Sequence, residues 1–155
     1  MKQFLTKLIL VFTVLLLNSA CLHAQSKYVK TYRHLADSLG KAYGIPPAII
    51  LGVAIIESSS GTEKKAKLLN NHFGIIGKNN LLKTKRIKTR YKAYPNVKAS
   101  YIDFCKVLMR KRFYPRLKYK KDINLWADAI SKSGYTEKPL LWKKRIVATI
   151  HKHRL

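Results

Sequence analysis

The sequence predicts a small, mostly helical α+β domain, and three observations support this fold class. Apolar residues recur at spacings of three and four along most of the chain after residue 26. Residues 86–94 instead alternate between uncharged and basic side chains, which is the pattern of a half-buried strand. The chain has 155 residues, enough for one domain with a core but not for two of ordinary size. We therefore expect about six helices and one small β-hairpin around a single core.

Residues 1–24 have the pattern of an export signal and are set apart from this domain. Two lysines precede an apolar run over residues 8–17, and small and polar residues follow it. This run is shorter than the roughly 20 apolar residues that a membrane-spanning helix needs. Cleavage after Ala24 would leave residues 25–155 as the mature domain. In the alternative, a lipoprotein, Cys21 of "NSAC" would be acylated and would hold the protein on a membrane.

The first two helices of the domain are marked by spacing and by prolines. Apolar residues from Tyr32 to Tyr43 lie three and four positions apart, and a glycine and Pro46 then end the segment. Pro46 and Pro47 suit the start of a second helix, which is apolar on every face up to Glu57. A helix of this kind is expected to be buried.

The signals change between Gly61 and Tyr94. Gly61 ends the second helix, and Thr62 can cap a short helix over residues 63–71. The segment "HFGIIGKNN" then contains two glycines and an asparagine pair, which indicate a turn. Together with the alternating stretch, it predicts a β-hairpin lobe over residues 73–94 with a basic exposed face.

Helices are expected again after Pro95. The stretch "SYID", Ser100–Asp103, matches a capping box before an apolar run. Two further helices begin at Asp122 and at Thr136, and the first of them stops at Gly134. The last helix is expected to bury one apolar stripe, formed by Leu141, Trp142, Ile146 and Ile150 or by a similar set of residues.

The composition limits the partners of the chain without naming one. Lysine and arginine total 32 against seven acidic residues, a net charge of +25; without the two lysines of the signal segment it is +23. In an exported protein this charge favours anionic cell-wall polymers or membrane surfaces, with binding that weakens as salt rises. The charge alone would also suit a nucleic-acid-binding protein. Against this stand the signal segment and a sequence without helix-turn-helix, zinc-finger or RNA-binding signatures.

Cysteine and histidine give no reason to expect a metal or an organic cofactor. Cys105 lies at helical spacing among apolar residues, so we expect a small buried side chain and not a nucleophile. His151 and His153 are two positions apart on an expected helix and therefore face different ways, which does not suit a zinc site.

Glu57 is the main chemical signal. The stretch "AIILGVAIIESSSG" places one carboxylate at the end of the most apolar segment of the domain. Burial disfavours the ionised form and raises the pKa of a carboxyl group, which is what a general acid at neutral pH requires. The alternative is a structural glutamate that caps or pairs at a helix end.

Four segments favour the catalytic interpretation through their order, namely "YGIPPAIILGVAIIESSSG", "NNHFGIIGK", "YKAYPNVKASYIDF" and "SGYTEKPLLWKKRIVATI". With them, residues 28–151 resemble the bacterial endo-β-N-acetylglucosaminidases of glycoside hydrolase family 73, which hydrolyse cell walls. Lytic transglycosylases share "ES" and a nearby glycine but continue with a different stretch. The resemblance implies a lysozyme-like fold, with the glycan between a helical lobe and a small β-lobe, and no cofactor.

The resemblance also assigns roles to single residues. Glu57 matches the catalytic acid of the family, and Tyr135 matches a tyrosine that lines the cleft near it. That tyrosine is usually followed by Ala-Thr, whereas here Thr136 follows directly and Glu137 stands near where the family often has Asp or Asn. The family's Asn-x-Phe-Gly segment, which shapes the cleft floor and would help to hold the saccharide, is matched by Asn71, His72, Phe73 and Gly74. Structural alternatives stay open, because Phe73 and Tyr135 also suit the core and Asn71 also suits a helix end.

One departure concerns the second carboxylate that many family members carry in the β-lobe. Residues 64–102 contain neither Asp nor Glu, so a two-carboxylate scheme has no evident second member. The 2-acetamido group of the substrate could act as the nucleophile instead. Alternatively, Glu63 or Glu137 could position water, or the domain has lost hydrolysis and only binds glycan.

These observations together predict an exported peptidoglycan hydrolase of the periplasm or cell envelope. It would cleave the β-1,4 bond after N-acetylglucosamine, with Glu57 protonating the leaving oxygen and Tyr135 contacting the sugar or the attacking water. The alternatives are a glycan-binding module on the same fold, and a lytic transglycosylase or muramidase.

Overall fold

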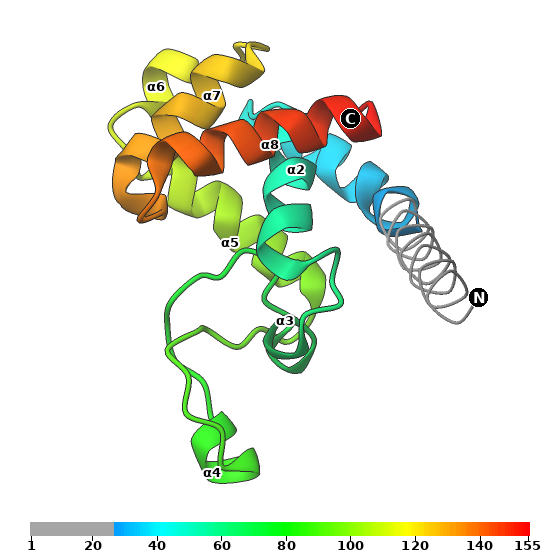
Figure 1. Cartoon of the computed structure of the whole chain (residues 1–155), viewed down its shortest axis with the longest axis vertical. Helices are drawn as coiled ribbons and strands as arrows, with labels where there is room; N and C mark the ends of the chain where they lie inside the picture. The colour runs from blue at the N-terminus through cyan, green and yellow to red at the C-terminus, as the bar shows by residue number, and fades with distance from the viewer. Residues whose placement is uncertain (1–26) are drawn as a thin grey trace, which may run out of the picture.

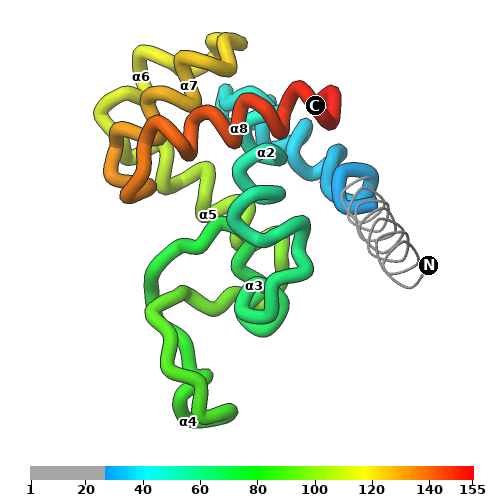
Figure 2. Tube along the Cα trace, in the orientation of Figure 1, coloured from blue at the N-terminus to red at the C-terminus, as the bar shows by residue number. Residues whose placement is uncertain are grey.

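The computed structural model describes residues 27–155, and its helices gather around α2 (Figures 1 and 2). The predicted export signal, its cleavage site and Cys21 lie outside the described residues. The helices are, in chain order, residues 27–43, α2 (Pro47–Ser58), α3 (Lys64–Leu69), α4 (Leu81–Lys85), α5 (Val97–Met109), α6 (Tyr114–Leu117), α7 (Ile123–Ile130), the π-helix η1 (Ser131–Tyr135) and α8 (Pro139–His153). The mostly helical fold class is thus confirmed. None of the helices in this part of the chain has the length and apolar character to cross a membrane.

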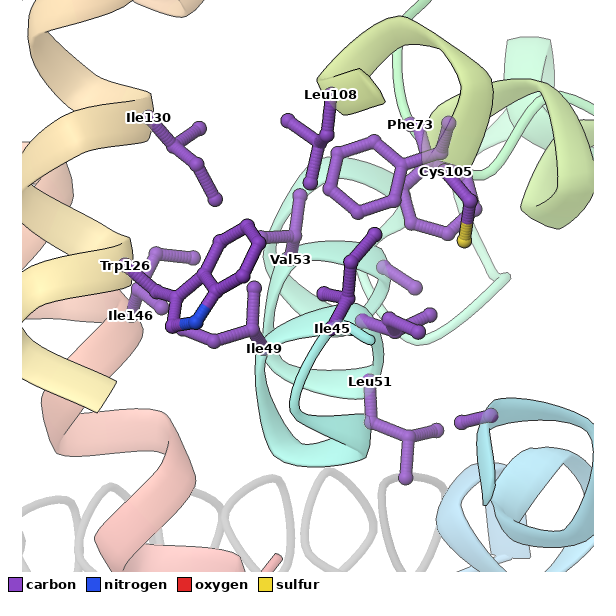
Figure 3. Packing of buried hydrophobic residues seen from close by; sticks show 14 of the residues in the cluster. Ile45, Ile49, Leu51, Val53, Phe73, Cys105, Leu108, Trp126, Ile130 and Ile146 are labelled. Carbon is purple, nitrogen blue, oxygen red and sulfur yellow. The ribbon is translucent and has the colours of Figure 1, made fainter. Parts of the chain in front are cut away.

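Helix α2 forms the centre of the core because it is apolar on every face. Eight of its twelve residues are buried, as the sequence predicts. Ile49 and Val53 of this helix lie between Trp126 and Ile146 on one side and Phe73 on the other (Figure 3). Since full burial of one large apolar side chain contributes about 1.5–3 kcal/mol, this helix is a main source of stability and a rigid support for its last turn.

Helix α8 packs on α2, and Gly52 permits the close approach (Figure 1). A Cβ atom at Gly52 would lie 2.9 Å from Cγ1 of Ile150 and 3.7 Å from Cγ2 of Ile146. In a core packed at crystal-like density, a larger residue here would push the two helices apart. The contact matters for the site, because the side chains of Glu57 on α2 and Trp142 on α8 meet.

Two helices begin at caps other than those predicted. Helix α3 is capped by Glu63 and not by Thr62, since the Glu63 carboxylate accepts a hydrogen bond from the N–H of Ala66 at 2.7 Å. Helix α5 is capped by Asn96, whose Oδ1 accepts a hydrogen bond from the N–H of Ala99 at 2.9 Å. Ser100 therefore lies inside this helix, buried, and not at a capping box. In both cases another acceptor stood within four residues of the predicted cap and took its place.

The later helices follow the prediction more closely. As predicted, α7 begins at Asp122, and the Asp122 side chain caps it by accepting from the N–H of Leu125 at 3.0 Å. Helix α8 begins at Pro139 and not at Thr136, and Leu141 is 53% exposed. The buried stripe of α8 repeats every four residues, as Trp142, Ile146 and Ile150, which leaves position 141 on the neighbouring face. The burial predicted for Cys105 is confirmed.

The predicted β-hairpin is present as two antiparallel segments but without regular strands. Residues 73–94, called the arm below, form two antiparallel chain segments that leave the body and are joined by α4 (Figures 1 and 2). Within residues 27–155 a single bridge, Ile76 to Tyr91, takes the place of regular strands. The reason is a side chain, because the Asn79 amide donates to the carbonyls of Thr89 at 3.0 Å and Tyr91 at 2.8 Å. Hydrogen bonds of this kind offer the backbone an alternative to a regular ladder.

Candidate active site

Glu57 lies where two cavities adjoin, between the helical body and the arm. Both cavities are also lined by Gly74 and Tyr91, so they form one cleft with Glu57 at the junction. The first cavity, of about 200 Å³, is further lined by Glu63, Lys65, Ala66, Leu69 and Asn71. The second, of about 390 Å³, is further lined by residues that include Phe73, Ile76, Arg90, Tyr135 and Glu137.

The carboxyl group of Glu57 is held by an indole. Glu57 is half-buried at the end of α2, and Nε1 of Trp142 donates a hydrogen bond to its Oε1 at 2.7 Å. Burial raises the pKa of Glu57 above its usual range, while the Trp142 hydrogen bond and the positive charge of Arg145 act in the opposite direction. The raised pKa favours a carboxyl group that keeps its proton at higher pH than an exposed glutamate does.

The two oxygens of Glu57 have different surroundings. An indole N–H is only a donor, so Oε1 must accept in both protonation states and Oε2 carries the proton of the neutral acid. Oε2 faces Gly74, where a Cβ atom would lie 3.7 Å from it. Gly74 has φ +64°, a left-handed conformation that suits glycine, and it leaves the space beside Oε2 free of a side chain. This arrangement can present a proton to the cleft.

Tyr135 lines the second cavity and forms a hydrogen bond to the predicted floor segment, residues 71–74. Its hydroxyl donates to the carbonyl of Phe73 at 2.6 Å, and its ring centroid lies 5.5 Å from that of Trp142. Burial and the negative charge of Glu57 raise the pKa of Tyr135 well above its usual range. The phenol therefore remains protonated at neutral pH and joins the end of η1 to the predicted floor segment.

Asn71 and Phe73 shape that floor from within. The Asn71 amide donates to the carbonyls of Ile75 at 2.8 Å and Lys92 at 2.9 Å, and its Oδ1 accepts from the N–H groups of Phe73 and Ile75. These bonds use the full capacity of an amide side chain. The ring of Phe73 stacks on Phe104 with centroids 4.3 Å apart and is buried. Both residues line the cleft, but their side chains are engaged by the protein itself.

His72 is not brought to the cleft. Its ring is buried among Tyr28, Tyr32 and Tyr101, and its Nδ1 lies 2.7 Å from the hydroxyl of Tyr28. Burial lowers the pKa of His72 to about 4, so the ring is neutral at physiological pH. It supports the floor segment from the core side, while its neighbours Asn71 and Phe73 line the cavities.

The two acids that the sequence offers beside Glu57 both reach the cleft, one in each cavity. Glu63 lines the first, but its carboxylate already accepts the hydrogen bond that caps α3. Glu137 lines the second and is exposed. Basic groups are present on the walls as well, with Lys65 in the first cavity and Arg90 in the second.

The partners of Glu57 are not evident from the sequence. Apolar spacing indicates only that Trp142 lies on a buried stripe, and no local signal marks Arg145. Trp142 lies 85 positions from Glu57, so no local spacing marks the pair. As for metals, residues 27–155 contain no group of three or more His, Cys, Asp or Glu side chains that could hold an ion.

Comparison with known proteins identifies the family. The model of the mannosyl-glycoprotein endo-β-N-acetylglucosaminidase family matches residues 33–155. The chain belongs to this glucosaminidase family. It is therefore a glycoside hydrolase, and the predicted resemblance is confirmed. No curated protein matches the sequence.

Several solved structures share the fold of this chain at low sequence identity. The catalytic domain of the autolysin Auto from Listeria monocytogenes has a TM-score of 0.70 and 19% identity, covering 84% of this chain and 85% of that one. The glycoside hydrolase domain of FlgJ from Salmonella typhimurium has a TM-score of 0.65 and 18% identity, covering 84% and 88%. A peptidoglycan hydrolase from Sphingomonas sp. A1 has a TM-score of 0.65 and 19% identity, covering 81% and 86%. The lysozyme-like fold is thereby confirmed.

Proposed function

We propose that this glucosaminidase is an exported peptidoglycan hydrolase that cleaves the β-1,4 bond after N-acetylglucosamine, with Glu57 as general acid. The observation that carries the proposal is the position of Glu57 at the junction of the cleft, with Oε1 held by Trp142 and Oε2 facing Gly74. Peptidoglycan as the substrate is supported by the similar hydrolase of Sphingomonas sp. A1.

In this mechanism Glu57 transfers the proton of Oε2 to the leaving glycosidic oxygen. The resulting carboxylate is then stabilised by the Trp142 N–H and by the charge of Arg145, the two groups that oppose the rise of its pKa. Tyr135 lines the same cavity, and its hydroxyl holds the floor through the Phe73 carbonyl. In the proposed mechanism the Tyr135 side chain contacts the sugar or the attacking water.

The nucleophile is proposed to come from the substrate. The arm carries no acid, and the Glu63 carboxylate is engaged at the start of α3. Attack by the 2-acetamido group needs only Glu57 from the protein, as is known for other glycosidase families. Glu137, exposed on the second cavity, is the second candidate, and it would position water.

Export and location are part of the proposal. Residues 1–24 have the pattern of a cleaved signal, which would deliver the enzyme to the periplasm or cell envelope; acylation at Cys21 is the second candidate. The net charge of +23 over residues 25–155 would hold it on acidic wall polymers or membrane surfaces, less strongly as salt rises. A role in nucleic-acid binding is not proposed.

The test is digestion of purified sacculi, with analysis of the new reducing ends. We expect N-acetylglucosamine ends from the wild type, none from Glu57→Gln, and unchanged sacculus binding by that variant. Glu63→Gln and Glu137→Gln are the matched carboxylate controls, and on the acetamido route both keep most of the activity. N-acetylmuramic acid ends or anhydro products would instead assign a muramidase or transglycosylase. Binding without cleavage by the wild type would assign a glycan-binding module.

A further inference from the structure

The arm is a shaped extension of the protein. Its two segments are joined by hydrogen bonds from Gly77 N–H to the Arg90 carbonyl at 2.9 Å and from Lys92 N–H to the Ile75 carbonyl at 2.8 Å. Near its tip the Asn79 side chain bridges to the opposite segment. The arm leaves the body beside α3 and ends in α4 (Figures 1 and 2). Its side chains are therefore displayed at defined places.

The charge of the arm is of one sign and is almost wholly unpaired. Six of its basic side chains are exposed: Lys78, Lys83, Lys85, Arg86, Lys88 and Arg90. Residues 64–102 contain no acid. Among residues 27–155, the only ion pair that the arm makes joins Lys92 to Asp103, at its base. Like charges gathered on one extension repel one another and destabilise the protein, so such an extension is suited to an anionic ligand.

The arm is continuous with the catalytic cleft. Ile76, Arg90 and Tyr91 belong to the arm and also line the cavity that contains Glu57. The other exposed cations of the arm line neither of the two cavities next to Glu57, so they lie beyond the reach of a sugar bound at that residue. A ligand that contacts both must be long and must carry negative charge along its length.

We infer that the arm is an exosite that binds the carboxylates of the peptides attached to the glycan, while the glycan itself occupies the cleft. The inference rests on the proposed function and adds a second point of contact outside the catalytic site. It favours the polymer over a membrane because the arm and the cleft share residues, and a flat bilayer would not enter the cleft. The exosite raises the local concentration of acidic polymer and does not act on the chemical step.

The test compares two triple variants with the same loss of charge. The arm variant is Lys83→Gln, Lys85→Gln, Lys88→Gln. The control is Arg116→Gln, Lys120→Gln, Lys121→Gln, at exposed positions that line neither cavity next to Glu57. Each is assayed at low salt on intact sacculi and on glycan strands from which the peptides have been removed. A second arm variant, Lys78→Gln with Arg86→Gln, repeats the test at other positions.

We expect the arm variants to lose about tenfold in kcat/KM on intact sacculi, with kcat/KM on peptide-free glycan unchanged. The control should match the wild type on both substrates, and high salt should remove the difference between variants. Equal loss on both substrates would overturn the inference, because the arm would then shape the cleft. The inference would also be overturned if the arm variants matched the control in kcat/KM on intact sacculi. This holds even if the arm variants bind anionic phospholipid vesicles more weakly than the control does, because the arm would then be a membrane-binding surface.

Failure of the proposed function is distinguishable from failure of the exosite. If no variant cleaves either substrate, binding replaces the kinetic assay. Co-sedimentation measures binding to intact sacculi, and isothermal titration calorimetry measures binding to the soluble peptide-free glycan strands. Weaker binding of the arm variants to intact sacculi alone would still support the exosite. Binding equal to that of the control would exclude it.

Discussion

Replacing Trp142 with phenylalanine tests whether the indole holds the charge of Glu57. Phenylalanine keeps an aromatic ring beside Tyr135 but removes the N–H that donates to Oε1 at 2.7 Å. A hydrogen bond to a charged group contributes about 1.5–3 kcal/mol, against about 1 kcal/mol for a neutral pair. Because Glu57 is only half-buried and is partly screened by solvent, the lower end applies to its ionised form.

The sign of the pH dependence follows from linkage. The pKa of Glu57 is raised in the folded protein, so ionisation of this group costs stability as pH rises through its ordinary value and then through its folded value. Without the Trp142 hydrogen bond this cost grows, since the bond favours the ionised form. Trp142→Phe should therefore lose about 0.5–1 kcal/mol more stability at about pH 8 than at about pH 4.

The assay is urea denaturation of the wild type and of Trp142→Phe at the two pH values. Loss of packing at the smaller ring lowers stability equally at both, so only the difference between them reports the hydrogen bond. An equal deficit at both pH values would refute the reasoning and leave Trp142 a packing residue. If Glu57 is the general acid, the alkaline limb of the activity profile of the variant should also move to higher pH.

Two further predictions concern stability alone. Ser59 ends α2 at φ +49°, so Ser59→Gly should stabilise the protein by about 0.5–1 kcal/mol in urea denaturation, whereas Ser59→Ala, which keeps the left-handed strain, should not; a gain from both would contradict the explanation. Burial alone would raise the pKa of Asp103, but hydrogen bonds from Lys92 and Tyr94 outweigh it and hold that pKa below its usual range. The contribution is present above the ordinary carboxyl pKa and is lost as pH falls through the folded value, so Asp103→Asn should cost about 1 kcal/mol at neutral pH and little at about pH 2, and an equal cost at both would exclude this origin.

Local signals predicted the helices well and their caps less well. The all-apolar character of α2 predicted its burial, and the sequence pattern predicted the start of α7 at Asp122. At α3 and α5, two possible caps stood within four residues of each other, and the choice depended on packing. Ser100, for example, donates to the carbonyl of Val97 inside the helix, and the N–H of His72 lies 3.5 Å from its hydroxyl.

The arm shows a different limit of sequence patterns. Alternation over residues 86–94 predicted which side chains would be exposed, and Lys88 and Arg90 are. Alternation describes faces, however, and does not say which groups satisfy the backbone. Here the Asn79 side chain does so, and the expected strands reduce to one bridge.

The sequence by itself determined the family, the mostly helical fold and the burial of the helix that ends in Glu57, because hydrophobic periodicity and segment order are local properties of the chain. It also determined that the arm would be basic. Only the tertiary structure decided what surrounds Glu57. Trp142 reaches it from 85 positions away because α8 crosses α2 at Gly52, and His72 turns into the core while its neighbours line the cleft. Such pairings depend on how helices pack in three dimensions, so they cannot be predicted from the short-range spacing of residues.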